Sequence, residues 1–166
     1  MSNEEKQLLL EDLCARLPYG VKATTTSNGW KDVYIVSGCK DDRIYLDCPV
    51  YDEGDDEWLI EFVKTYLRPM SSMTEEDLIS YAKYEFANDD IYKIVDIRCT
   101  GKGFINIYCS LLRDPEHYPV TFQRTKTSPL ENWRGIDWLN SHHFDFRCLI
   151  EKGLALEAPD GMYNSK

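Results

Sequence analysis

The stretch WLNSHHFDFRCLIEKGLALEAP, residues 138–159, decides how the chain ends and holds its densest group of reactive side chains. Leu139 and His143 are four residues apart, which is the spacing of one helical face. Gly153 can supply the left-handed conformation that terminates a helix. The residues LALEA then alternate as in an edge strand until Pro159. We therefore predict a C-terminal helical cap that ends at Gly153 and is followed by a short strand.

The same stretch suggests one alternative function, a small metal-dependent hydrolase. Its candidate ligands are His142, His143, Asp145 and Cys148. Adjacent residues on a helix point about 100° apart, so the two histidines cannot both face one ion if the helix continues through them. A catalytic zinc site needs three protein ligands and a water, so a distant residue such as His117 would have to contribute. We predict that no metal or other cofactor binds here.

Cys148 is the candidate nucleophile of this stretch. Its neighbours Phe146, Leu149 and Ile150 predict a buried thiol, and apolar burial raises the pKa of a thiol and makes it inert. Neither a Ser-His-Asp arrangement nor a glycosidase carboxylate pair has a recognisable signature in the chain. The sequence therefore predicts a protein that is not an enzyme.

Upstream, the chain alternates between helical and strand spacing, which predicts a single α+β domain over residues 1–166. An N-terminal helix is expected from Asn3 to Leu17, with Ser2 as its N-cap and Pro18 at its end. Residues 19–48 form three short alternating runs separated by turns. This pattern predicts an antiparallel β-meander.

A middle helix and a second β-hairpin complete the predicted fold. The helix begins after Thr74, a natural N-cap, and ends near Asn88. Residues 90–112 alternate on both sides of the turn TGKG, as in a β-hairpin. The long connection at 113–132 contains VTFQR, a candidate edge strand, and leads into the C-terminal helical cap. Residues 58–69 are compatible with either a helix or a strand.

The net charge of −10 limits the possible partners. Residues 1–83 carry 17 acidic and 9 basic side chains, a net of −8, whereas residues 84–166 have a net of −2. Direct binding to nucleic acid is disfavoured, because phosphate contacts need clustered Lys and Arg. An acidic face can instead dock on a protein with a basic surface and speed the encounter.

An acidic loop at residues 49–57, PVYDEGDDE, is the candidate partner-binding site. It lacks the ligand spacing of a calcium-binding loop. The aromatic residue that follows the loop is a possible anchor for a partner. The candidate residues are Asp52, Glu53, Asp55, Asp56, Glu57 and Trp58.

The beginning of the chain, MSNEEKQLLL, has no basic segment followed by a long apolar run, and no stretch approaches the ~20 apolar residues of a membrane span. We expect a cytoplasmic protein without a membrane partner. Its six cysteines form no CxxC pair and should be reduced in that compartment. Cys39 and Cys48, like Cys99 and Cys109, flank predicted turns, but a native disulfide is disfavoured for the same reason.

Three phrases together resemble a family of small uncharacterised proteins encoded by phages and mobile elements of gut Bacteroidales. They are LLLEDLCARLPYGVK at 8–22, YLRPMSSMTEED at 66–77 and WLNSHHFDFRCLIEKGLALEAPDGMY at 138–163. Family members usually have tyrosine and glycine where this chain has Phe146 and Cys148, which further discounts a catalytic role for Cys148. The resemblance implies an accessory protein made in an infected or element-bearing bacterium.

These observations favour a non-enzymatic, acidic protein-interaction module. In the context that the resemblance implies, its partner would be a host or phage protein with a basic surface, and inhibition of a host defence or nucleic-acid-processing protein would be its concrete task. The alternatives are the metal-dependent hydrolase described above and a structural oligomer such as a minor virion component. The sequence does not decide the oligomeric state.

Overall fold

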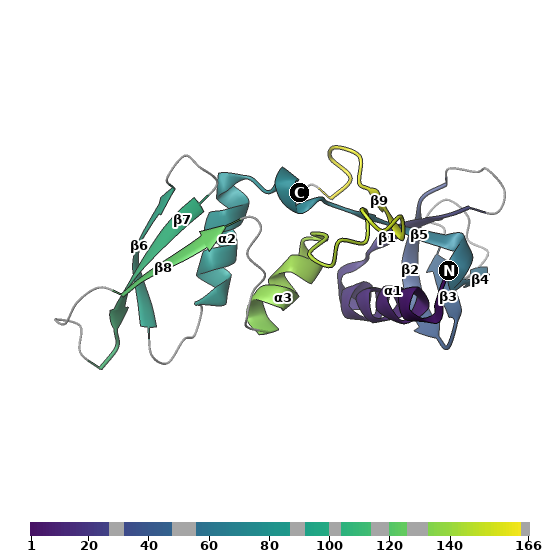
Figure 1. Cartoon of the computed structure of the whole chain (residues 1–166), viewed down its shortest axis with the longest axis horizontal. Coiled ribbons are helices and arrows are strands. Elements are labelled where there is room, and N and C mark those ends of the chain that lie inside the picture. Colours follow the sequence, from purple (N-terminus) through teal and green to yellow (C-terminus); the bar gives the residue numbers. More distant parts are fainter. Residues whose placement is uncertain are drawn as a thin grey trace. The chain divides into compact units, whose positions relative to one another are not determined.

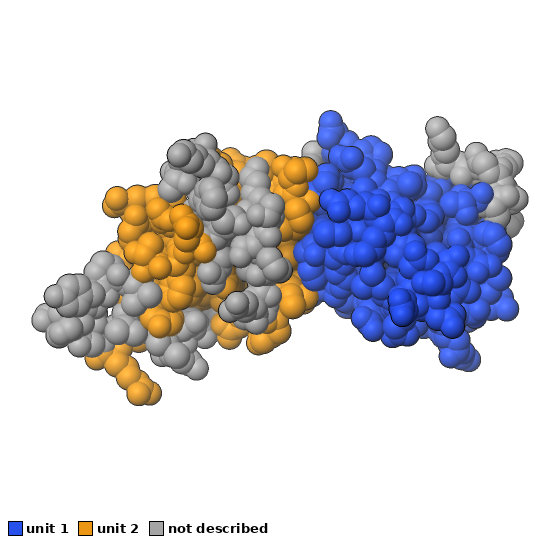
Figure 2. Space-filling model, viewed as in Figure 1, with its two compact units in different colours: residues 1–69, 140–166 blue, residues 70–139 orange. Residues whose placement is uncertain are grey.

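The computed structural model describes residues 1–26, 32–47, 56–86, 92–99, 104–113, 120–125 and 133–163. Helices and sheets are mixed along the chain, so the predicted α+β class is confirmed (Figure 1). The chain divides into two compact units, coloured separately in Figure 2. Unit 1 comprises Met1–Pro69 and Asn140–Lys166, and unit 2 comprises Met70–Leu139. The sequence, treated as one domain over residues 1–166, did not indicate this division.

The N-terminal helix α1, Asn3–Arg16, begins at the predicted cap. The N–H of Glu5 donates to Ser2 Oγ at 3.1 Å, and the N–H of Ser2 donates to Glu5 Oε2 at 2.6 Å. This reciprocal capping box satisfies two N–H groups that the first turn would otherwise leave unpaired. A short 3-10 turn, Leu17–Tyr19, follows the helix, as expected from the proline in this segment.

A six-stranded sheet forms the rest of unit 1, with the order β4-β3-β2-β1-β5-β9 (Figure 1). The first three strands in the chain are the predicted antiparallel meander, and β9 is an edge strand that runs parallel to β5. The strands are β1 (Lys22–Thr25), β2 (Tyr34–Lys40), β3 (Arg43–Asp47), β4 (Asp56–Leu59), β5 (Val63–Leu67) and β9 (Ala155–Glu157). Helix α1 packs on this sheet and buries Leu9 and Leu13 in the core.

A β-bulge at Ser37 changes which side chains of β2 face the core. Val36 pairs with the buried Leu46, whereas Gly38 pairs with Tyr45 after the register shift. Because one extra residue inverts the alternation of a strand, the residue after Gly38 returns to the inward side.

Unit 2 contains helix α2 (Glu75–Glu85), strands β6 (Tyr92–Cys99), β7 (Phe104–Leu111) and β8 (Val120–Thr125), and most of helix α3 (Trp133–Ser141). The strands form an antiparallel sheet in the order β6-β7-β8, so the predicted hairpin and edge strand are confirmed.

Helix α2 starts at the predicted cap, where Asp77 N–H donates to Thr74 Oγ1 at 3.1 Å. It ends at Glu85, three residues before the predicted end at Asn88. Ring contacts hold unit 2 together: Phe86 and Tyr92 each lie with their ring centroid 5.1 Å from that of Phe122.

The structure decides one segment that the sequence left open and corrects the end of the C-terminal helix. Residues 58–69, which were compatible with helix or strand, are mostly strand, with a 3-10 turn at Ile60–Phe62 between β4 and β5. The C-terminal helix ends at Ser141, whereas the sequence predicted helix up to Gly153. Residues 142–153 consist mainly of turns, because His143 (φ +59°) and Cys148 (φ +56°) adopt the left-handed conformation, which interrupts a helix. The left-handed conformation predicted for Gly153 is present, with φ +68°.

Candidate functional site

Four exposed carboxylates lie at one margin of the unit 1 sheet, in the β2–β3 turn and on the edge strand β4. We call this group the acidic edge: Asp41, Asp42, Asp56 and Glu57. The Asp42 carbonyl accepts a hydrogen bond from Ile60 N–H at 2.9 Å, which fixes the turn beside the end of β4. Exposed charges on an edge strand also discourage unwanted pairing with another chain.

The predicted acidic loop at 49–57 ends earlier than expected. Asp56 and Glu57 belong to β4 and pair with β3 opposite Leu46 and Tyr45. The other candidate acids of the loop, Asp52, Glu53 and Asp55, lie outside the described residues. The strand was not recognised because two carboxylates are untypical of strands, whereas edge positions tolerate them.

Arg43 lies among these carboxylates. Its Nη1 is 2.8 Å from Glu57 Oε1, and its Nε is 3.7 Å from Asp42 Oδ1. About half of each side chain is exposed, with values of 49%, 47% and 55% for Arg43, Glu57 and Asp42. Solvent therefore screens both ion pairs, and the acidic edge stays predominantly negative.

Trp58 was predicted to be an aromatic anchor for a partner. It pairs with the fully buried Ile44 and packs against the core of unit 1, with its side chain partly buried. Its indole Nε1 is buried and has no hydrogen-bond partner. Trp58 therefore supports β4 from the inner side of the sheet.

A surface hollow of about 330 Å³ adjoins the acidic edge. Its lining combines side chains from the beginning of α1 with two aspartates of the acidic edge and Ile60: Asn3, Lys6, Gln7, Leu10, Asp41, Asp42 and Ile60. The cation in this lining, Lys6, has its Nζ 3.0 Å from Glu61 Oε2 and is paired with that carboxylate. A long side chain with a cationic end fits the chemistry of this lining, since its stem can contact the leucine and isoleucine while its charge meets the carboxylates.

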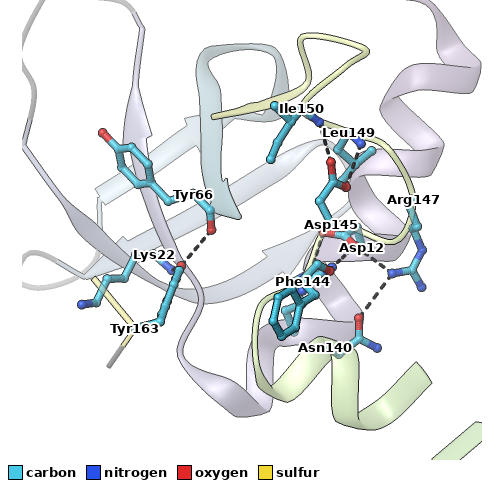
Figure 3. Close-up of polar contacts among 11 residues, drawn as sticks. Asp12, Lys22, Tyr66, Asn140, Phe144, Asp145, Arg147, Leu149, Ile150 and Tyr163 are labelled. Atoms are coloured by element: carbon cyan, nitrogen blue, oxygen red, sulfur yellow. Dashed lines mark hydrogen bonds and ion pairs between the residues drawn. The ribbon is translucent and has the colours of Figure 1, made fainter. Parts of the chain in front are cut away.

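The histidine-rich stretch that the sequence marked as an alternative site is a set of structural contacts. Asp145, 5% exposed, is the centre of its turn. Its Oδ1 accepts a hydrogen bond from Leu149 N–H and its Oδ2 accepts one from Ile150 N–H, both at 2.8 Å (Figure 3). Both oxygens of this candidate metal ligand thus accept hydrogen bonds from backbone N–H groups.

His143 is buried beneath the C-terminal segment. Its ring stacks on that of Tyr163, with centroids 3.9 Å apart and an angle of 24° between the planes. Burial, reinforced by the charge of Arg16, lowers the pKa of His143 to about 3. The imidazole is therefore neutral near pH 7, and its Nδ1 is buried without a hydrogen-bond partner.

The other two members of the stretch lie in different surroundings. His142 Nδ1 is 3.0 Å from Ser141 Oγ. Cys148 is exposed, so the prediction of a buried thiol is wrong: its left-handed backbone turns the side chain outward although its neighbours in sequence are apolar. Within the described ranges no three His, Cys, Asp or Glu side chains are grouped to hold a metal ion, and His117 falls outside those ranges.

A buried ionic network links α1 to this stretch, and no pattern in the sequence indicates it. Asp12 accepts a hydrogen bond from Arg16 Nε at 2.8 Å. It accepts another from Arg147 Nη1 at 2.7 Å (Figure 3). Arg16 Nη2 donates to the Phe144 carbonyl at 2.9 Å. Asp12 and Arg16 are both fully buried. Their spacing of four residues is common on exposed helices, so it does not reveal that this pair lies inside the protein.

Tyr163 bridges two strands, which the sequence also did not indicate. The ladder between β1 and β5 ends at the pair Ala23 and Thr65. Beyond it, the Tyr163 hydroxyl accepts from Lys22 N–H at 2.8 Å and donates to the Tyr66 carbonyl at 2.9 Å (Figure 3). A side chain thus replaces one direct step of the ladder.

Comparisons with protein-family models, with curated proteins and with solved structures gave no match to this chain. In the described part of the chain, no helix is long and apolar enough to cross a membrane.

Proposed function

We propose that this protein is a non-enzymatic interaction module of a phage or mobile element, and that its acidic edge binds a basic surface of a bacterial protein. The observation that carries the proposal is the set of four exposed carboxylates beside a hollow that two of them line. Only one basic side chain, Arg43, forms ion pairs with these carboxylates among the contacts of the described residues.

The hollow supports a specific mode of docking. An arginine or lysine of the partner enters between α1 and the β2–β3 turn, and its charge meets Asp41 and Asp42. Its aliphatic stem lies against Leu10 and Ile60. Asp56 and Glu57 then face further basic groups along the exposed edge of the sheet.

The charge of the whole chain supports the same partner class. A net of −10 repels nucleic acid and accelerates the encounter with a positively charged protein surface. Proteins that process nucleic acid present such surfaces, because they must contact phosphates. Occupying that surface would inhibit a host defence or nucleic-acid-processing protein, and this is the concrete form that we propose.

The test compares two charge-reversal variants of the tagged full chain in lysate of a Bacteroidales host. Asp42→Lys with Asp56→Lys alters the acidic edge, and the matched control, Glu157→Lys with Asp160→Lys, alters exposed acids at and after β9, the opposite edge strand of the same sheet. We expect the first variant to bind the captured protein at least about tenfold more weakly, because two attractive charges become repulsive.

The control should bind as tightly as the unmodified protein. Raising the salt concentration should weaken the binding of the control and of the unmodified protein, because salt screens the attraction between charges. Circular dichroism checks that each variant is folded. Equal losses in the two variants, or binding that does not respond to salt, would contradict a role for the acidic edge.

A further inference from the structure

The bulge at Ser37 brings a cysteine to the inner side of the sheet. Without the extra residue, Cys39 would point away from α1, since residues of a strand alternate between faces. With it, Cys39 pairs with the fully buried Ile44 and packs against the core of unit 1. A bulge that re-aims one side chain is a common device at functional positions.

A second cysteine, Cys14, lies on helix α1, which packs on the side of the sheet that Cys39 faces. Cys14 follows Leu10 by four residues, so it lies on the same face of α1 as this leucine, which packs against the core. Helix α1 packs against β2, and the Cys14 side chain lies within hydrogen-bond reach of the Cys39 thiol. In the sequence, Cys39 and Cys48 flank a predicted turn where a disulfide is disfavoured, and Cys48 lies outside the described residues.

The two thiols differ in access to solvent. Cys14 is exposed, whereas Cys39 is partly buried. Burial, together with the neighbouring Cys14, raises the pKa of Cys39 to about 12. Because the thiolate is the reactive form, Cys39 is a poor first target for an oxidant, and the exposed Cys14 is reached first.

We propose that Cys14 and Cys39 are a peroxide-responsive dithiol, which closes into a disulfide between α1 and β2. The proposal rests on the inward register of Cys39, the helical position of Cys14 and the packing of α1 against β2. It does not depend on the acidic edge. The oxidant is hydrogen peroxide, and a small thiol such as glutathione reverses the reaction.

The chemistry proceeds in two steps. Cys14 loses its proton to solvent, and its sulfur attacks one peroxide oxygen: an S–O bond forms, the O–O bond breaks, and the departing hydroxide takes up a proton to become water. The sulfur of Cys39 then attacks the Cys14 sulfenic acid. The S–S bond forms, the S–O bond breaks, and the thiol proton of Cys39 leaves with the hydroxide as a second water.

The first experiment uses the unmodified full chain. The protein is treated with hydrogen peroxide, its remaining thiols are alkylated, and it is digested with trypsin without reduction. Cleavage after Arg16, Lys22 and Lys31 places the two cysteines in separate peptides. We expect a linked pair of peptides, about 2 Da lighter than the sum of the two, that disappears on reduction. Peroxide treatment that leaves Cys39 fully alkylatable would overturn the proposal.

Variants give an independent readout through dimedone, which labels sulfenic acids. In Cys39→Ser the Cys14 sulfenic acid has no thiol to condense with, so dimedone labelling at Cys14 should rise several-fold over the unmodified protein. In Cys14→Ser, Cys39 should stay unlabelled. Cys148→Ser, which removes another exposed thiol, is the matched control and should leave the link intact. Unchanged labelling at Cys14 in the first variant would argue against Cys39 as its partner.

Discussion

The carboxylate of Asp145 forms a turn where the spacing of apolar residues predicts a helix. The sequence around it has helical spacing, but its two oxygens accept hydrogen bonds from the N–H groups of Leu149 and Ile150. Side chains of aspartate compete in this way with the regular hydrogen bonds of a helix. The spacing of apolar residues carries no information about such local bonds, which is why the helix predicted beyond Ser141 is wrong.

Replacing Asp145 should therefore destabilise unit 1. Asp145→Ala leaves two N–H groups without their acceptor in a site that is 5% exposed, so we expect a loss of about 2–4 kcal/mol in the free energy of unfolding. Urea denaturation measures it. Asp160→Ala, at an exposed aspartate in the same segment, should change the free energy by less than about 0.5 kcal/mol. Equal effects would mean that the two backbone bonds contribute little.

His143 predicts a pH dependence of stability. Its pKa is about 3 in the folded protein and near 6.5 in the unfolded chain, so only the unfolded chain gains a proton as the pH falls below about 6.5. Stability should fall by about 1 kcal/mol between about pH 7 and about pH 5.5. His143→Asn, which tolerates the left-handed backbone, should be less stable at pH 7 but should lack this part of the slope. An unchanged slope in the variant would assign the effect to other groups.

At the scale of elements, the sequence predicts where helices start and which segments are strands. It does not predict strand pairing between segments that are distant in the sequence. Ser2 and Thr74 marked the beginnings of α1 and α2 because capping is local. The meander was readable because its turns join neighbouring strands. The bulge at Ser37 and the side-chain bridge at Tyr163 depend on tertiary packing, and neither leaves a local pattern.

The bridge between β1 and β5 can be tested by removing one oxygen atom. Tyr163→Phe keeps the ring on His143 but leaves Lys22 N–H and the Tyr66 carbonyl without their shared partner. We expect a loss of about 1–2 kcal/mol in the free energy of unfolding and faster hydrogen exchange at the Lys22 amide.

Tyr84→Phe is the matched control for this experiment. Tyr84 is 41% exposed, and its hydroxyl donates to Asp137 at 2.7 Å at the surface of unit 2. Since water can replace an exposed hydrogen bond, we expect a change below about 0.5 kcal/mol. If Tyr163→Phe behaves like this control, the hydroxyl is not an energetically important part of the sheet.

At the scale of the whole molecule, the sequence indicates that the candidate site is acidic, but it identifies only two of the four carboxylates that form it. The negative charge of the first half was plain from the sequence, and Asp56 and Glu57 were named from it. Asp41 and Asp42 join them because the β2–β3 turn lies beside the end of β4. Asp42 and Asp56 are 14 residues apart in the sequence, and only the pairing of strands in the sheet brings their segments together. Sequence patterns therefore do not show that they are neighbours.

The division into units has a consequence for biosynthesis. Unit 2 is one continuous segment, whereas unit 1 needs both Met1–Pro69 and residues that follow Leu139. On the ribosome, Asp12 of α1 and strand β5 therefore emerge long before Arg147 and β9, the partners that contact them from the last part of the chain. At about 5–20 residues per second, the intervening segment delays these contacts by several seconds. During that interval β5 lacks its neighbour β9 and Asp12 lacks Arg147, so the nascent chain is most vulnerable to aggregation and proteolysis before translation ends.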